Sequence, residues 1–149
     1  MIQLIKTNSN NEDFIKLVSF LDAELAIKDG KDHAFYHQFN GIANLNHVVV
    51  AYKNEQAIGC GAIKPINDSA MEVKRMFVPE SARGLGIATK VLKELEVWAK
   101  DLGYKKCILE TGKKQVEAIA LYKKCNYNII PNYGQYQGVE NSICFEKQL

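Results

Sequence analysis

Residues 71–92, MEVKRMFVPESARGLGIATKVL, constrain the fold more than any other stretch of this 149-residue chain. Their first half predicts a buried strand, which ends at Pro79 because proline has no N–H for the sheet. A turn containing Gly84 and Gly86 then leads into an amphipathic helix. The first N–H groups of a helix have no internal partners, and a helix N-terminus carries about half a positive charge. The stretch therefore predicts an anion site, with pyrophosphate as its natural ligand and Arg83 as an added cation.

Two better-known phosphate motifs do not fit. A dinucleotide-binding fingerprint requires a small residue where Thr89 stands, and an acidic residue about 20 positions on, where residues 104–106 are Tyr-Lys-Lys. A Walker loop over residues 107–114 lacks its leading glycine and the Ser or Thr after its lysine. Glycines between a strand and a helix are also ordinary turn residues. What remains is Arg-x-x-Gly-x-Ala at residues 83–88, after a strand that ends in Val-Pro.

Length and composition indicate one globular domain over residues 1–149. The hydrophobic fraction is 47%, and no apolar run reaches the roughly 20 residues that span a bilayer. The N-terminus becomes polar too early for a signal peptide, so we expect a cytoplasmic protein without a membrane partner. The net charge of +2 comes from 19 basic and 17 acidic residues, which is too balanced to indicate a nucleic-acid partner.

The cysteine and histidine patterns do not indicate a metal site. Four cysteines lie far apart without a C-x-x-C pair, and we expect four buried free thiols: Cys60, Cys107, Cys125 and Cys144. His33 and His37 have an i, i+4 spacing that can bind zinc, but no third ligand accompanies them. We interpret them as ordinary helix residues.

Hydrophobic periodicity and turn residues predict alternating strands and helices. Strands are expected at residues 2–6, 47–53, 57–66, 70–78, 106–111, 127–130 and 142–146, and helices at about 12–27, 32–40, 86–102 and 115–125. A helix separates the strands at 70–78 and 106–111, so this pair should be parallel with a right-handed crossover. In the helix at 115–125, we expect Val116, Ile119 and Ala120 to face the core.

The pattern at residues 83–88 resembles the acyl-CoA pyrophosphate loop of the GNAT superfamily of N-acyltransferases. Residues 117–127, EAIALYKKCNY, are similar to the GNAT motif in which a helical Tyr precedes a turn and an aromatic residue. Residues 48–63 are similar to the central hairpin of the family, so the resemblance covers nearly the whole chain. Asn126 departs from the usual Gly, and residues 111–113 stand where many members carry a cofactor-contacting Asn.

The resemblance implies a single-domain α/β fold with a mixed, mostly antiparallel sheet of about seven strands and about four flanking helices. It also implies acetyl-CoA as the co-substrate, with no metal. The residues expected to bind it are Met76, Phe77, Val78, Arg83, Gly84, Leu85, Gly86, Ile87, Ala88 and Thr89. A backbone N–H within residues 76–78 would stabilise the oxyanion, a contribution on the order of 3 kcal/mol.

The implied reaction is direct transfer of an acetyl group to a primary amine within a ternary complex. An alkylamine with a pKa near 10.4 is mostly protonated at pH 7, which costs ~4.6 kcal/mol, so a base is useful. Glu72 stands where certain family members hold that base. It can equally be a solvated residue or an ion-pair partner of Lys74 or Arg75, with water as the base. Tyr122 is the expected acid for the CoA thiolate, and its alternative role is packing.

The acceptor is expected to be a small-molecule amine or a peptide. Tyr133, Tyr136 and Phe35 are candidates for the acceptor pocket, although the two tyrosines could simply cover the edge of the core. The chain could act as a monomer or a homodimer. A catalytically silent CoA-binding or sensor module, and a nucleotide-binding regulatory domain, remain as alternatives.

Overall fold

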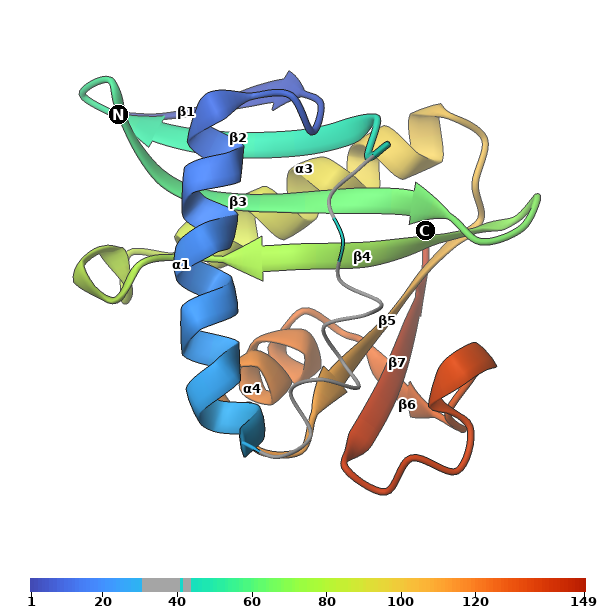
Figure 1. Cartoon of the computed structure of the whole chain (residues 1–149). Coiled ribbons are helices and arrows are strands. Elements are labelled where there is room, and N and C mark those ends of the chain that lie inside the picture. The colour runs from blue at the N-terminus through green and yellow to red at the C-terminus, as the bar shows by residue number, and fades with distance from the viewer. Residues whose placement is uncertain (31–40, 42–43) are drawn as a thin grey trace.

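One mixed sheet of seven strands organises the part of the chain that the computed structural model describes, residues 1–30, 41 and 44–149. The strand order is β1-β2-β3-β4-β5-β7-β6 (Figure 1). The strands are β1 Ile2–Thr7, β2 His47–Lys53, β3 Gln56–Pro65, β4 Ala70–Phe77, β5 Lys106–Gly112, β6 Asn128–Ile130 and β7 Ser142–Gln148. The helices are α1 Glu12–Asp29, α3 Ile87–Asp101 and α4 Val116–Lys124, with short 3₁₀ turns η2 Glu80–Ala82 and η3 Gly134–Tyr136.

The sheet is antiparallel except where β4 and β5 run parallel, as expected from the intervening helix α3. The β2–β3 hairpin closes through Asn54 and Glu55, whose φ angles of 52° and 66° suit a tight two-residue turn. Helix α1 begins where expected, because the Asn11 side chain accepts a hydrogen bond of 2.9 Å from the Phe14 N–H.

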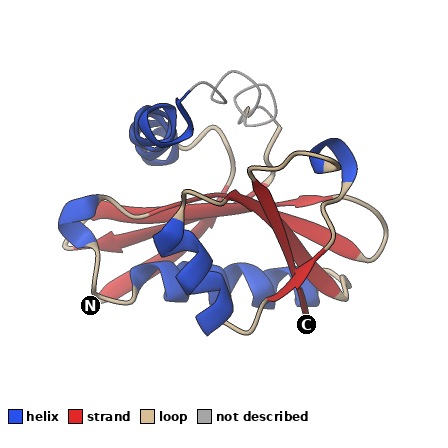
Figure 2. Cartoon of the chain, turned by 90° about the horizontal axis from the view of Figure 1, so that it is seen from below, coloured by secondary structure: helices blue, strands red, loops and turns tan. Residues whose placement is uncertain are grey.

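Helices cover both faces of the sheet: α1 lies on one face, and α3 and α4 lie on the other (Figures 1 and 2). The alternation along β2 follows from this arrangement. Val48 and Val50 pack with the buried side chains of α1, whereas Val49 and Ala51 pack with those of α3. Because both faces are covered, β2 is a nearly continuous apolar run.

The structure confirms most of the predicted elements and corrects some details. The described residues contain three α-helices instead of about four, and the helix expected over residues 32–40 lies outside them. Val116 is 69% exposed and Ala120 is also exposed, so the expected inward face of α4 was wrong for both. Tyr122 is the buried residue of that helix. All four cysteines are buried and free, as predicted.

Candidate active site

The strands β4 and β5 separate after a short common stretch, and the space between them holds the candidate site. They pair only from Ala70 with Lys106 to Glu72 with Ile108. Beyond that point two adjoining cavities open. We call them the loop cavity, of about 280 Å³, beside residues 76–89, and the inner cavity, of about 140 Å³, between residues 72–76 and 110–112.

A β-bulge in β4 shapes the wall that both cavities share. Cys60 is paired with Phe77 and Ala62 with Lys74, so β4 carries one residue more than β3 over this stretch. Arg75 lies within the bulge and has a φ of 57°, an uncommon conformation for a residue other than glycine. A Cβ on Gly61 would collide with the sulfur of Met76, so the glycine makes room for that side chain. The bulge therefore changes the direction of the backbone at residues 76–78.

The loop cavity contains nine of the ten residues predicted to bind a co-substrate. Those residues are Met76, Phe77, Val78, Arg83, Gly84, Gly86, Ile87, Ala88 and Thr89. Leu85 is absent from the lining, and its side chain is 56% exposed. Gly84 and Gly86 have φ angles of 86° and 76°, and a Cβ on either would meet no atom within 4 Å. Since α3 begins at Ile87, its unpaired N–H groups border an open cradle of a kind that suits phosphate.

Arg83 is held by neighbouring groups rather than standing alone as a cation. Its Nε donates to the Val78 carbonyl at 2.8 Å, and its Nη2 donates to both Glu24 oxygens at 2.9 and 3.1 Å. Glu117 lies 3.6 Å from Nη1. The two carboxylates also line the loop cavity, so a phosphate would have to share the guanidinium with them or displace them.

The inner cavity is charged, and Glu72 lies in its wall with both oxygens occupied. Tyr133 donates a hydrogen bond of 2.5 Å to Glu72 Oε2, and Lys74 Nζ lies 3.6 Å from Oε1. Tyr136 lines the same cavity, edge-to-face with Tyr133 at a centroid distance of 5.8 Å. The structure thus brings Glu72, Tyr133 and Tyr136 together, while Phe35 lies outside the described residues.

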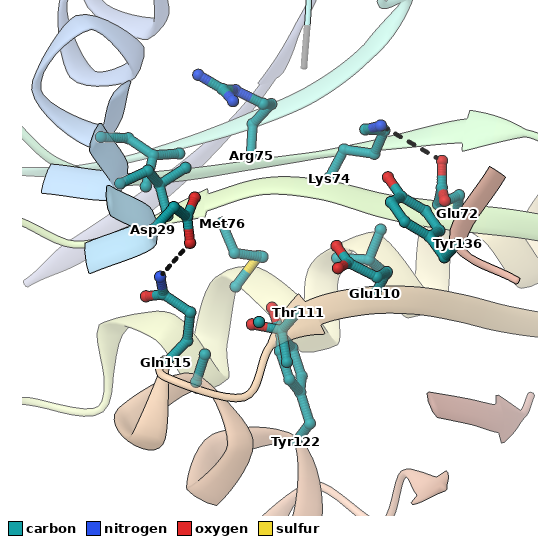
Figure 3. Close-up of a pocket in the computed structure, with 15 residues that line it drawn as sticks. Asp29, Glu72, Lys74, Arg75, Met76, Glu110, Thr111, Gln115, Tyr122 and Tyr136 are labelled. Atoms are coloured by element: carbon teal, nitrogen blue, oxygen red, sulfur yellow. Dashed lines mark hydrogen bonds and ion pairs between the residues drawn. The ribbon is translucent and has the colours of Figure 1, made fainter. Parts of the chain in front are cut away.

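Tyr122 lines both cavities and is 6% exposed. Its ring rises from α4 toward Thr111 at the end of β5 (Figure 3). Contacts with Tyr127 and Phe145, at centroid distances of 5.8 and 5.9 Å, fix its orientation. Burial raises the pKa of Tyr122, so the phenol keeps its proton at neutral pH.

Glu110 is a site residue that the sequence analysis missed. It comes from β5, lines the inner cavity, and accepts a hydrogen bond of 2.6 Å from Ser142 Oγ to its Oε2. Burial raises its pKa to about 7, although the Ser142 hydrogen bond and the nearby Lys74 charge act in the opposite direction. A charged residue next to the end of an apolar strand, in Cys-Ile-Leu-Glu-Thr, was the feature that could have identified it.

Helix α1 contributes two apolar side chains and one acidic side chain to the wall of the inner cavity. Leu21 and Leu25 line the inner cavity, together with Asp29, whose Oδ1 accepts a long hydrogen bond of 3.5 Å from Gln115. Arg75 also borders the cavity and is ion-paired with Asp22. Across the described residues, no cluster of His, Cys, Asp and Glu has the arrangement of a metal site, and no helix is long and apolar enough to span a bilayer.

Comparisons with known proteins agree with this geometry. Residues 14–127 match the family model described as the acetyltransferase (GNAT) family. The chain is 37% identical over 102 residues to an IAA acetyltransferase of Azospirillum brasilense, an alignment that covers 68% of this chain and 67% of that protein.

Solved structures share the fold over the full chain. A Klebsiella pneumoniae protein described as an acyl-CoA N-acyltransferase superposes with a TM-score of 0.84 at 27% identity, covering 100% of this chain and 98% of the other. An Elizabethkingia anophelis GNAT acetyltransferase, solved with acetyl-CoA bound, gives a TM-score of 0.69 at 21% identity, with coverages of 99% and 98%.

Proposed function

Because this chain belongs to the GNAT family of acetyltransferases, we propose that it transfers an acetyl group from acetyl-CoA to a primary amine. The observation that carries the proposal is the junction of two cavities at Tyr122. The loop cavity offers a helix N-terminus, two open glycines and a cation for a pyrophosphate. The inner cavity offers carboxylates for an ammonium group. An acyl donor and an amine bound in these two places would meet beside one phenol.

We propose that acetyl-CoA enters through the loop cavity and uses the residues predicted from sequence. The cradle of residues 83–89 would hold the pyrophosphate, and the backbone of residues 76–78 would hydrogen-bond the pantetheine arm and the developing oxyanion. That backbone lies beyond the last β4–β5 pair and next to the bulge, which favours donors turned into the gap between the strands. Solved acetyltransferase structures that contain acetyl-CoA support the choice of co-substrate.

Tyr122 is proposed to protonate the departing thiolate. It lines both cavities, which is where the thioester sulfur must lie if the acyl group faces the amine. Because burial raises the pKa of Tyr122, the residue is a proton donor at neutral pH and not a nucleophile. The amine's own proton leaves to a base in the inner cavity, for which the sequence suggests Glu72 or water.

The test is a screen of primary amines, amino acids, aminoglycosides and peptides with acetyl-CoA, monitored by thiol release and by the mass of the acceptor. Acetylation of at least one amine, absent without enzyme, is the expected result. Binding of acetyl-CoA without thiol release from any acceptor would instead support a silent CoA-binding module. Binding of ATP in place of CoA would support a nucleotide-binding domain.

A further inference from the structure

Glu110 has the geometry of a proton acceptor in the inner cavity. In Figure 3 its carboxylate extends from β5 into the space facing β4, between Asp29 and Glu72. Among the described residues, Ser142 is the hydrogen-bond partner of this carboxylate, and it contacts Oε2. The Oε1 atom is therefore left for a ligand that carries an N–H donor.

Glu72 lacks this freedom. Tyr133 and Lys74 occupy its two oxygens, and the Glu72 side chain is only 5% exposed. An amine at Glu72 would compete with a tyrosine hydroxyl and an ammonium group that are already in place. Asp29, Glu72 and Glu110 all line this cavity, but Glu72 has the contacts of a structural anchor for residues 133–136.

The surroundings of Glu110 are charged on several sides. The groups that face it are Asp29 from α1, Glu72 and Lys74 from β4, Tyr122 from α4, and Tyr136, Ser142 and Cys144 from η3 and β7. Burial, Asp29 and Glu72 raise the pKa of Glu110, whereas Ser142 and Lys74 lower it. With a pKa of about 7, a large fraction of Glu110 is ionised at neutral pH, and its conjugate acid can release the proton again.

We propose that Glu110 is the catalytic base that takes the proton from the acceptor's ammonium group, and that Ser142 positions it. This inference rests on the proposed acetyltransferase function. The R–NH₃⁺ form of the acceptor gives one proton to Glu110 and becomes R–NH₂. The nitrogen lone pair then forms a bond with the thioester carbonyl carbon, and the C–S bond breaks with its electron pair remaining on sulfur.

The thiolate takes the Tyr122 proton, and the second proton lost by nitrogen as the amide forms restores Tyr122, directly or through water. Glu110 returns its own proton to solvent before the next turnover. The net products are the amide, the CoA thiol and one proton. The acceptor therefore binds as a primary alkylammonium ion, whose positive charge pairs with the ionised carboxylate of Glu110.

The experiment compares kcat/KM against pH for the parent, Glu110→Gln and Glu72→Gln, with acetyl-CoA and an amine identified by the screen. In the parent, kcat/KM should decrease as the pH is lowered below about 7, because Glu110 becomes protonated. Glu110→Gln should lose the inflection near pH 7 and fall on the order of 100-fold at pH 7, and its rate should then rise continuously with pH toward the pKa of the free amine. Unchanged acetyl-CoA affinity by calorimetry shows that the variant is folded.

Glu72→Gln should keep the inflection but move it to lower pH, because a neighbouring negative charge that raises the pKa of Glu110 is removed. Ser142→Ala should move the inflection to higher pH, because the hydrogen bond that favours ionised Glu110 is lost, and Ser142→Thr should restore its position. An inflection that survives in Glu110→Gln and disappears in Glu72→Gln overturns the proposal. A parent that binds acetyl-CoA but acetylates no amine overturns the proposed function instead.

Discussion

At the scale of single residues, the contacts of Tyr122 fit its proposed role more closely than the contacts of Glu72 fit the role of a base. Tyr122 is buried, fixed by two aromatic neighbours, and common to both cavities. The structure places Glu72 in the inner cavity but gives it the ion pair with Lys74 that was its alternative interpretation. Burial lowers the pKa of Lys74, and the negative charge of Glu72 partly offsets that decrease.

Replacing Tyr122 with Phe removes the hydroxyl and keeps the ring that packs against Phe145. If the hydroxyl acts only on the departing thiolate, kcat should fall on the order of 100-fold while the Kd for acetyl-CoA changes little. Steady-state kinetics and calorimetry measure the two quantities separately.

Tyr127→Phe is the matched control, because Tyr127 lies beside Tyr122 but lines neither cavity. It donates a buried hydrogen bond of 2.8 Å to Glu96, so its loss should lower Tm and leave kcat in place. Equal kcat values for Tyr122→Phe and the parent would make Tyr122 a packing residue.

At the scale of elements, the β4–loop–α3 unit forms much of the lining of the loop cavity. The sequence predicted this unit because each of its parts has a local cause: proline ends a strand, glycine permits a positive φ, and apolar residues recur at helical spacing. The β4 bulge could not be predicted in the same way. The residues that contact it belong to other elements: Gly61 on β3 leaves room for the Met76 side chain, and Asp22 of α1 is ion-paired with Arg75.

Gly86→Asp should weaken acetyl-CoA binding by at least about 10-fold, because it places a side chain and a negative charge in the cradle. Gly103→Asp is the matched control at the other end of α3. Gly103 also has a positive φ, 95°, and a Cβ there would likewise meet no atom within 4 Å. Calorimetric Kd values should separate the two variants, and equal affinities would place the phosphate site elsewhere.

At the scale of the whole molecule, the parallel pairing of β4 with β5 was accessible from the sequence, whereas the composition of the inner cavity was not. Residues 72, 110 and 142 come from three different strands. The pairing of β5 with β7 brings Ser142 to Glu110, and the splay of β4 and β5 opens the space that Glu72 and Glu110 line. Periodicity describes one element at a time, so Glu110 had no feature that linked it to Ser142 or Asp29. The single-domain organisation, the cytoplasmic location and the choice between monomer and homodimer stay predictions.

The most direct measurement of the central claim is thermal unfolding with increasing acetyl-CoA, compared with equal concentrations of ATP. A ligand that binds only the folded state stabilises it by about 2.7 kcal/mol at 100 times its Kd. For a chain of this length that corresponds to a rise in Tm of roughly 5–10 °C. We predict such a rise, increasing with the logarithm of the acetyl-CoA concentration and much smaller with ATP. A Tm that stays constant up to millimolar acetyl-CoA would contradict the assignment of the space between β4 and β5 as an acetyl-CoA site.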